Sequence, residues 1–289
     1  QEMREQYLPK PTDHKWSAGV RENTGDAILE GIRLGAKMHR LDEAWWCNTI
    51  SVPGEEIPRL SIMEKSYPGS IVVNPAGERF SNESQNYMAF QQETFVKHTA
   101  ENPCNPSWQI FDANFRATYF VGPLYNSKFR PDWLIPKSYE ERGFFAKADT
   151  VRELARKIDV DPEGLENTVA KMNDYARDGV DPDCHRGESA YDRYYGDPRV
   201  TPTPCLAPVD KPPYYAMRVE PGDFGTQGGM VVNADAQVLH EEGHVIKGLY
   251  AIGNCSAPTL PCYPGPGSTL GTAMTFAYQA AKAITGYQD

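Results

Sequence analysis

The sequence lacks several patterns that would assign a protein class at once. No G-x-G-x-x-G motif follows a strand-like run, so the phosphate-binding fingerprint of dinucleotide-binding domains is missing. No apolar run reaches the roughly 18 residues of a membrane span, and residues 1–15 are too polar for a signal peptide. None of the six cysteines forms a C-x-x-C pair, which favours unpaired thiols and a cytoplasmic protein, with peripheral membrane contact as an alternative.

Composition describes a globular chain with an excess of acid. The 289 residues can bury a large core in one or two domains, and 40% of them are hydrophobic. The formal net charge of −10 argues against a nucleic-acid partner.

The stretch from Gly248 to Ile284 has the pattern of a strand, a loop and a helix. Residues 249–252 are a short apolar run between glycines, which predicts a buried strand. Residues 254–267 are rich in proline and glycine, and Ser268 or Thr269 can cap the helix that follows. The apolar positions of that helix fall three or four residues apart. A helix that begins beside a loop offers unpaired N–H groups to an electron-rich ligand.

Two features of the loop favour a ligand site over an ordinary connection between a strand and a helix. Gly265 and Gly267 leave the backbone bare beside the helix start, so a flat ligand can approach closely. Tyr263 precedes them with a hydroxyl that can donate one hydrogen bond.

Residues 240–244 read H-E-E-G-H and match the H-E-x-x-H signature of zinc proteases. That chemistry needs both imidazoles one turn apart on a helix. Here Glu242-Gly243 lies between two strand-like runs and indicates a hairpin turn, in which we expect His240 and His244 not to converge. The sequence therefore predicts no metal site.

Three segments resemble FAD-dependent 3-ketosteroid dehydrogenases, most closely the Δ1 type, of the succinate dehydrogenase/fumarate reductase flavoprotein superfamily. They are G-L-Y-A-I-G-N with Y-P-G-P-G-S-T-L-G (248–254 and 263–271), S-I-V-V-N-P-A-G-E-R-F-S-N-E-S-Q-N-Y (70–87), and T-G-D-A-I-L-E-G-I-R-L-G-A-K-M (24–38). A complete member of this family carries the missing dinucleotide motif near its N-terminus, and this chain begins without a methionine. We therefore expect the C-terminal half of a longer protein.

The resemblance implies a fold of α/β plus α+β class. Residues 1–56 and 214–289 would belong to a Rossmann-like FAD-binding domain, and residues 57–213 would form an inserted α+β catalytic cap. Within this plan the sequence predicts helices over 25–38, 87–97, 150–158 and 162–178 and strands over 70–73, 108–111, 214–219, 228–232 and 236–239, with 51–60 as a linker.

The resemblance also implies roles for three catalytic positions. Tyr263 and the backbone N–H of Gly267 would bind the 3-keto oxygen. Tyr87 would remove the C2 proton as tyrosinate, while the flavin N5 takes hydride from C1. A free tyrosine has a pKa near 10 and needs assistance, which the family provides through a second tyrosine in the half that this chain lacks.

The same comparison implies a set of FAD-binding residues. Asn254 would contact the ribityl chain, and the N–H groups of Thr269 and Leu270 would face the isoalloxazine O2. Gly253 and Ser268 complete the set. The implied partners are a 3-ketosteroid or similar apolar ketone, an external electron acceptor, and either the missing N-terminal half or a second copy of the chain.

Three alternatives remain at this stage. Fumarate reductases place a histidine before T-x-G-G and an arginine in the C-terminal loop, whereas Gly225 precedes Thr226 here and residues 263–271 contain no arginine, so a dicarboxylate would lack its clamp. Δ4(5α)-ketosteroid dehydrogenases are the nearest enzymatic alternative. A non-enzymatic alternative is an inactive fragment that keeps only the substrate cap.

Overall fold

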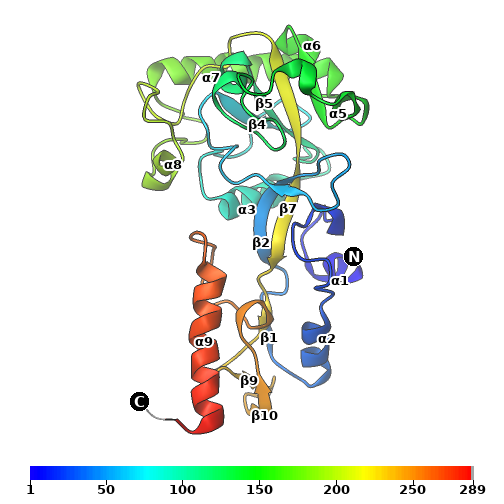
Figure 1. The fold of residues 1–289 in the computed structure, drawn as a ribbon, viewed down its shortest axis with the longest axis vertical. Helices are drawn as coiled ribbons and strands as arrows, with labels where there is room; N and C mark the ends of the chain where they lie inside the picture. The colour runs from blue at the N-terminus through cyan, green and yellow to red at the C-terminus, as the bar shows by residue number, and fades with distance from the viewer. Residues whose placement is uncertain (288–289) are drawn as a thin grey trace. The chain divides into compact units, whose positions relative to one another are not determined.

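The computed structural model describes residues 1–287, which form two compact units (Figure 1). Unit 1 contains Gln1–His14, Gly19–Trp45 and the chain from Asp223 onward, and unit 2 contains Lys15–Ala18 and Trp46–Gly222. Among the described residues, no helix combines the length and the apolar character that crossing a bilayer requires.

Unit 2 is built on a six-stranded antiparallel sheet in the order β3-β2-β7-β5-β4, with β6 also paired to β7. Its strands are β2 (Ala44–Ile50), β3 (Arg59–Leu60), β4 (Ser70–Val73), β5 (Ser107–Phe111), β6 (Phe145–Ala148) and β7 (Tyr214–Thr226). Its helices are α3 (Tyr87–Lys97), α4 (Ala113–Thr118), α5 (Lys137–Glu141), α6 (Val151–Lys157), α7 (Pro162–Asp178) and α8 (Ala190–Tyr194), with short 3₁₀ turns η1 (His14–Trp16) and η2 (Asp132–Leu134).

Alternating side chains give the sheet of unit 2 a core on each face. Ile71 and Ile110 pack in one cluster with residues of α6 and α7, while Val72 and Phe111 pack in the other with Phe90 of α3. Neighbouring residues of a strand point to opposite faces, so one short apolar strand can serve both cores. Figure 1 shows α6 and α7 along the end of the sheet that is farthest from α3.

Two expectations about the edges of this unit are wrong. Residues 51–60 were expected as a linker, but they contain β3, which pairs with β2. Residues 214–219 were expected to belong with the first domain, but β7 forms ladders with β5 and β6. The unit boundaries therefore fall after Trp45 and after Gly222 rather than at 56 and 214.

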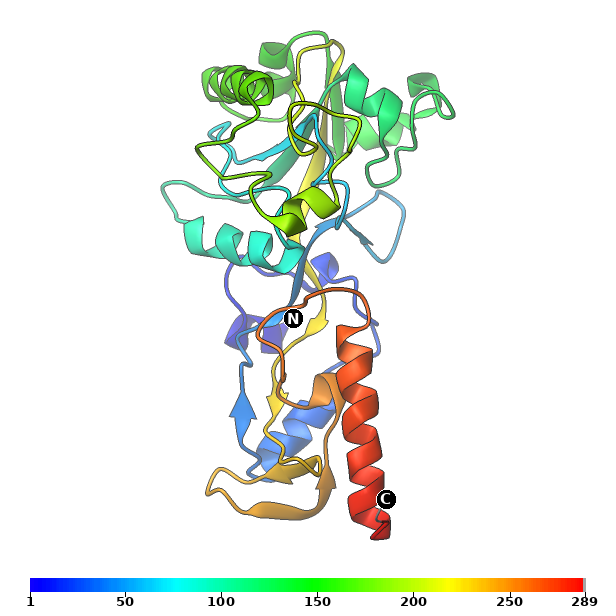
Figure 2. The same ribbon diagram turned by 90° about the vertical axis from the view of Figure 1, so that its left-hand side faces the viewer.

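Unit 1 has two small antiparallel sheets and one long helix. β1 (Met38–His39) pairs with β8 (Gly229–Met230), and β9 (Gln237–Leu239) pairs with β10 (Val245–Tyr250). The helices are α1 (Glu2–Tyr7), α2 (Asp26–Arg33) and α9 (Ser268–Thr285), with a 3₁₀ turn η3 (Gly253–Cys255) that packs against α9 (Figure 2). The core is small and contains Ala36, Met230, Val238 and Ala251.

The sequence predicted two elements of unit 1 with the wrong extent. The helix expected over 25–38 ends at Arg33, because Gly35 adopts a left-handed φ of 73° and Met38 already pairs in β1. The buried strand expected over 249–252 is β10, which ends at Tyr250 and is exposed or half-buried along its length. Among the described residues β10 has a strand partner on one side only.

Candidate functional site: the loop before helix α9

The start of α9 is fixed by the glycines of the preceding loop. Gly267 occupies the N-cap position with a left-handed φ of 92°, which a residue with a side chain adopts only under strain. The Ser268 hydroxyl donates a hydrogen bond to the Gly265 carbonyl at 2.5 Å. An α-helix leaves the N–H groups of its first turn without partners inside the helix. The predicted helix is present, but its cap was predicted wrongly: Gly267 is the N-cap, no side chain caps the helix, and Ser268 is already its first residue.

A hollow of about 380 Å³, partly open to solvent, lies beside this helix start within unit 1. Four residues that the sequence singled out line it: Gly253, Asn254, Ser268 and Thr269. The other lining residues are Trp45, Gln227, Ser256, Ala257, Pro258, Thr259, Leu260, Thr272 and Phe276. The hollow is thus bounded by η3, by the loop after it and by the first turns of α9.

Hydrogen bonding and close packing orient Asn254 in this wall. The Trp45 indole Nε1 donates to Asn254 Oδ1 at 2.9 Å, which fixes the amide with its NH₂ group on the other side. Gly253 has a left-handed φ of 56°, and a Cβ added to it would lie 3.3 Å from the Cβ of Ala273 in α9. The absence of a side chain at residue 253 lets η3 approach the helix closely.

Gln227 adds a polar group that the sequence analysis missed. Its side chain is buried, and Nε2 donates to the carbonyls of Leu260 and Pro261 at 3.2 and 3.4 Å. Within residues 1–287 its Oε1 has no hydrogen-bond partner. A buried acceptor of this kind is destabilising unless a ligand or water donates to it. In the sequence, Gln227 lies in the T-Q-G-G motif, whose neighbours argue only against a dicarboxylate substrate.

Tyr263 is held by aromatic packing next to the helix start. Its ring makes edge-on contacts with Trp45 and Phe224, with centroid distances of 5.0 and 5.1 Å. The side chain is 8% exposed, and its hydroxyl lies 3.5 Å from Thr269 Oγ1. Two neighbouring rings restrict its rotation, so the hydroxyl stays beside the first turn of α9.

Comparison with known proteins identifies the family of this site. A profile of the FAD binding domain matches residues 2–270. The chain belongs to the FAD-binding-domain family. It is 42% identical to 3-oxosteroid 1-dehydrogenase of Mycobacterium tuberculosis (strain ATCC 25618 / H37Rv) over 98% of this chain and 50% of that protein.

Two further relatives support the assignment to the FAD-binding-domain family. The chain is 38% identical to 4-oxocyclohexanecarboxylate 2-dehydrogenase of Sinomonas cyclohexanicum, over 91% of this chain and 46% of that protein. The solved structure of a 3-ketosteroid Δ1-dehydrogenase from Sterolibacterium denitrificans, in complex with 1,4-androstadiene-3,17-dione, superposes with a TM-score of 0.94 at 46% identity. That match covers all of this chain and 51% of the other. The chain spans about half the length of these relatives.

FAD is the cofactor of this family, as the sequence predicted, and the hollow has the features to accept its flavin ring. An isoalloxazine ring carries both carbonyl acceptors and an N–H donor. The first turn of α9 offers N–H donors to the carbonyl oxygens of the ring. The unpartnered Oε1 of Gln227 offers an acceptor to its N–H group. With Oδ1 of Asn254 accepting from Trp45, the amide NH₂ would be the group able to donate to a hydroxyl of the cofactor chain.

Tyr263, Gly267 and Leu270 are not among the residues that line the hollow. The Leu270 side chain is 68% exposed, so any contact of this residue with FAD would come from its backbone N–H. Gly267 immediately precedes the helix, and space around it is open, since a Cβ there would meet no atom within 4 Å. Its N–H remains a predicted ligand for a ketone oxygen.

Tyr87 lies in unit 2, so its position beside Tyr263 stays a prediction. It is the buried first residue of α3, as the sequence predicted for that helix. The Asn86 side chain caps the helix by accepting from the N–H groups of Met88 and Ala89 at 2.9 and 3.4 Å. Lys65 donates to the carbonyls of Glu83 and Gln85 just upstream, and burial lowers the pKa of Lys65 to about 8.

The expectation that His240 and His244 do not converge is wrong. The segment is a hairpin turn, as predicted, and not the helix of a zinc protease. In an antiparallel hairpin, however, residues on either side of the turn face each other across the strands. The two imidazole rings are stacked with a centroid distance of 4.5 Å.

Proposed function

We propose that this chain provides the substrate-binding residues and part of the flavin site of an FAD-dependent dehydrogenase that introduces a C1–C2 double bond into 3-ketosteroids. The observation that carries the proposal is the Tyr263 hydroxyl, which lies 3.5 Å from the Oγ1 of Thr269. Thr269 is one of the four expected cofactor residues that line the hollow. Relatives named as 3-oxosteroid 1-dehydrogenases and a solved Δ1-dehydrogenase, at 42% and 46% identity, support this substrate class.

The reaction needs groups that polarise the ketone and remove a proton. A C–H bond next to a ketone becomes acidic only when the carbonyl oxygen is stabilised as negative charge develops on it. In our proposal the Tyr263 hydroxyl and the Gly267 N–H donate to that oxygen. Because the Tyr263 ring is held between two aromatic side chains, its hydroxyl does not need to reorganise as the charge develops.

Tyr87 is the proposed base for the C2 proton. Its pKa in water is near 10, so it needs a neighbour that favours the phenolate. The family places a second tyrosine outside the stretch that this chain matches, and we propose that this residue helps Tyr87 to ionise. FAD, when bound, supplies the acceptor for the hydride that leaves C1, and an external electron acceptor then reoxidises the cofactor.

The two units would divide this work between them. Unit 1 would form part of a Rossmann-like FAD-binding domain, and unit 2 would be the inserted cap that carries Tyr87. Further chain, either in the same polypeptide or in a partner, would complete the flavin site.

The exposed apolar face of α9 supports a need for further chain. Leu270, Met274 and Tyr278 follow one another at intervals of four residues and therefore lie on one face. They are 68%, 72% and 52% exposed, although apolar helix faces of this length are normally covered.

Flavin binding and product analysis test the proposal. The chain, completed by the N-terminal half of a close relative, is purified and inspected for the visible absorbance of bound flavin. It is then incubated with a 3-keto-4-ene steroid and an artificial electron acceptor, with products identified by mass spectrometry and NMR. We expect a product that has lost one hydrogen each from C1 and C2. A colourless protein without turnover would favour the inactive fragment, and hydrogen loss at C4 and C5 would favour the Δ4(5α) reaction.

A small cyclic ketone is the second candidate substrate. The Sinomonas relative, at 38% identity, is named for the dehydrogenation of 4-oxocyclohexanecarboxylate. A carboxylate on the ring would need a cationic partner, and residues 263–271, which contain the proposed ketone-binding groups, include no lysine or arginine. We therefore expect a higher kcat/KM for the steroid, measured on both substrates with the same enzyme preparation.

A further inference from the structure

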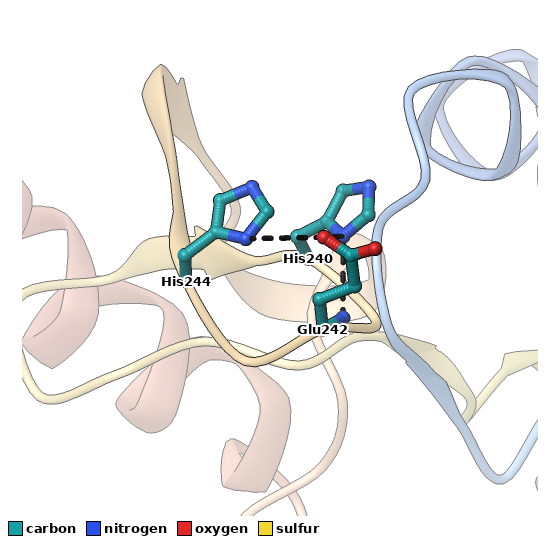
Figure 3. Close-up of side chains that lie close together, drawn as sticks. All are labelled: His240, Glu242 and His244. Carbon is teal, nitrogen blue, oxygen red and sulfur yellow. Dashed lines mark hydrogen bonds and ion pairs between the residues drawn. The ribbon is translucent and has the colours of Figure 1, made fainter.

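The tip of the β9–β10 hairpin brings three potential metal ligands together. The His240 N–H donates to the His244 carbonyl at 2.8 Å, and the Gly243 N–H donates to the His240 carbonyl at 2.8 Å. Gly243 allows this turn with a left-handed φ of 90°. The turn places the His240 and His244 side chains on the same side, with the Glu242 carboxylate facing the Nδ1 atom of each ring (Figure 3).

The distances among the three side chains approach those of a metal site. Glu242 Oε2 lies 3.9 Å from Nδ1 of His240 and 3.9 Å from Nδ1 of His244. One ligand atom from each residue lies within 4.8 Å of the other two. Metal–ligand bonds of roughly 2.0–2.2 Å in tetrahedral geometry place ligand atoms about 3.4 Å apart. Closing the site therefore requires the ligand atoms to approach one another by up to roughly 1.4 Å. The two nearly parallel imidazole rings must also turn, so that their nitrogen lone pairs point at one ion.

His240 is already held in position for this role. Its backbone bridges Ala36, and the following N–H of Glu241 donates to the Gly35 carbonyl at 2.9 Å. Its ring packs over Gly35, where an added Cβ would lie 2.3 Å from Nε2. Its Nδ1 accepts a long hydrogen bond of 3.2 Å from the Glu242 N–H, so the lone pair of Nδ1 is directed toward the turn. A metal ion would replace this weak bond.

We propose that His240, Glu242 and His244 form a surface site for one divalent transition-metal ion, with Zn²⁺ and Ni²⁺ as the best matches. Imidazole nitrogens select such ions over Mg²⁺ or Ca²⁺, and the carboxylate adds a charged oxygen ligand. The His244 and Glu242 side chains are 60% and 78% exposed, so water can complete the coordination. The ion would cross-link strands β9 and β10 next to their turn. No part of the hollow beside α9 is involved.

Calorimetric titration with NiCl₂ tests the site on protein freed of metal with a chelator. We expect one Ni²⁺ to bind per chain. His244→Ala and Glu242→Gln should each lower the affinity at least tenfold. Even residues that only hydrogen-bond to the ligands of a metal site commonly change its affinity by about 10–100-fold. Both side chains are exposed, so circular dichroism of the variants should match that of the unaltered protein.

Two controls make the result specific. His185→Ala removes another exposed histidine that contacts a glutamate, His185 Nδ1 lying 3.0 Å from Glu188 Oε1, and it should leave Ni²⁺ binding unchanged. Cys255→Ser with Cys262→Ser removes the two exposed thiols, which could themselves bind metal, and should also leave it unchanged. Absence of binding, binding that survives His244→Ala, or binding lost in either control would overturn the proposal.

Discussion

Replacing Tyr263 by phenylalanine removes one hydroxyl and leaves the ring. The ring contacts with Trp45 and Phe224, at 5.0 and 5.1 Å, are therefore retained. The hydroxyl is 3.5 Å from Thr269 Oγ1, beyond the usual O–H···O distance of about 2.5–3.0 Å, so this contact is weak. We expect the free energy of unfolding to change by less than about 1 kcal/mol.

The expected effect on catalysis is much larger. Loss of one donor to a developing oxyanion commonly lowers turnover about 100- to 1,000-fold, or roughly 3–4 kcal/mol in the activation barrier. Because the donor acts mainly on the charged transition state, kcat and kcat/KM should fall together. Steady-state kinetics with a 3-keto-4-ene steroid and an artificial electron acceptor measures both constants on the FAD-loaded enzyme.

A matched variant controls for the loss of a tyrosine hydroxyl in general. Tyr194 is the last residue of α8 and is 77% exposed, so Tyr194→Phe should keep wild-type turnover. The unfolding midpoint and the flavin content of both variants should match those of the wild type. Near-wild-type turnover in Tyr263→Phe would refute the role of this hydroxyl, and loss of bound flavin would show that Tyr263 acts on the cofactor site instead.

Three further substitutions probe buried contacts in both units. Burial alone would raise the pKa of Glu83, but the charge and hydrogen bonds of Arg79 lower it. Glu83→Gln would leave the buried Arg79 without this charged partner. It should therefore reduce the free energy of unfolding by about 3–5 kcal/mol in urea denaturation at neutral pH. The Glu83 carboxylate stabilises the fold at pH values above its unfolded-state pKa of about 4.3, and this stabilisation is lost as the pH falls through its lower folded-state pKa. The difference in free energy of unfolding between variant and wild type should therefore shrink in acid. A difference that does not change with pH would contradict this role of Glu83. Trp45→Phe removes the donor to Asn254 Oδ1 and should weaken FAD binding about tenfold, which a fluorescence titration would detect; equal affinity would contradict a role for the Asn254 amide. Gly77 has a φ of 76°, and a Cβ added to it would lie 2.3 Å from a backbone nitrogen of α7. Gly77→Ala should therefore lower the free energy of unfolding by about 1–3 kcal/mol, measured by thermal melts. An unchanged melting midpoint would refute this contact.

Local capping chemistry explains which helices the sequence predicted well. Asp161 and Pro162 start α7, and the left-handed Gly179 ends it, as expected. The Thr150 side chain accepts from the N–H of Glu153 at the start of α6, also as expected. These signals lie within a few residues of each other, so they can be read without knowledge of the fold.

Contacts between distant segments account for what the sequence did not show. Gln227 reaches the hollow by donating to the carbonyls of Leu260 and Pro261, more than 30 residues away, and no local pattern predicts this. Trp45 and Tyr263, whose rings pack together, lie still farther apart in the sequence. The error at His240 and His244 has another cause, because the hairpin itself was predicted and only the cross-strand pairing of its side chains was overlooked.

The segment that leads to Tyr87 is held by buried charged and polar groups. Arg186 donates to Ser84 Oγ at 2.9 Å and pairs with Glu83, and Lys65 donates to two carbonyls of the same segment. Buried ion pairs often contribute little more stability than apolar residues of the same volume. They do restrict the segment to one arrangement, because each displaced partner would leave a buried charge unpaired.

Such restriction is what the proposed base requires. A general base must lie within hydrogen-bond reach of the proton that it removes, at about 2.6–3.2 Å between heavy atoms. The Asn86 cap fixes the first turn of α3, and the charges upstream fix the backbone that enters it. The same buried groups that would be poor choices for stability alone are therefore well suited to holding Tyr87 in place, and Glu83→Gln should lower kcat even under conditions where the variant remains folded.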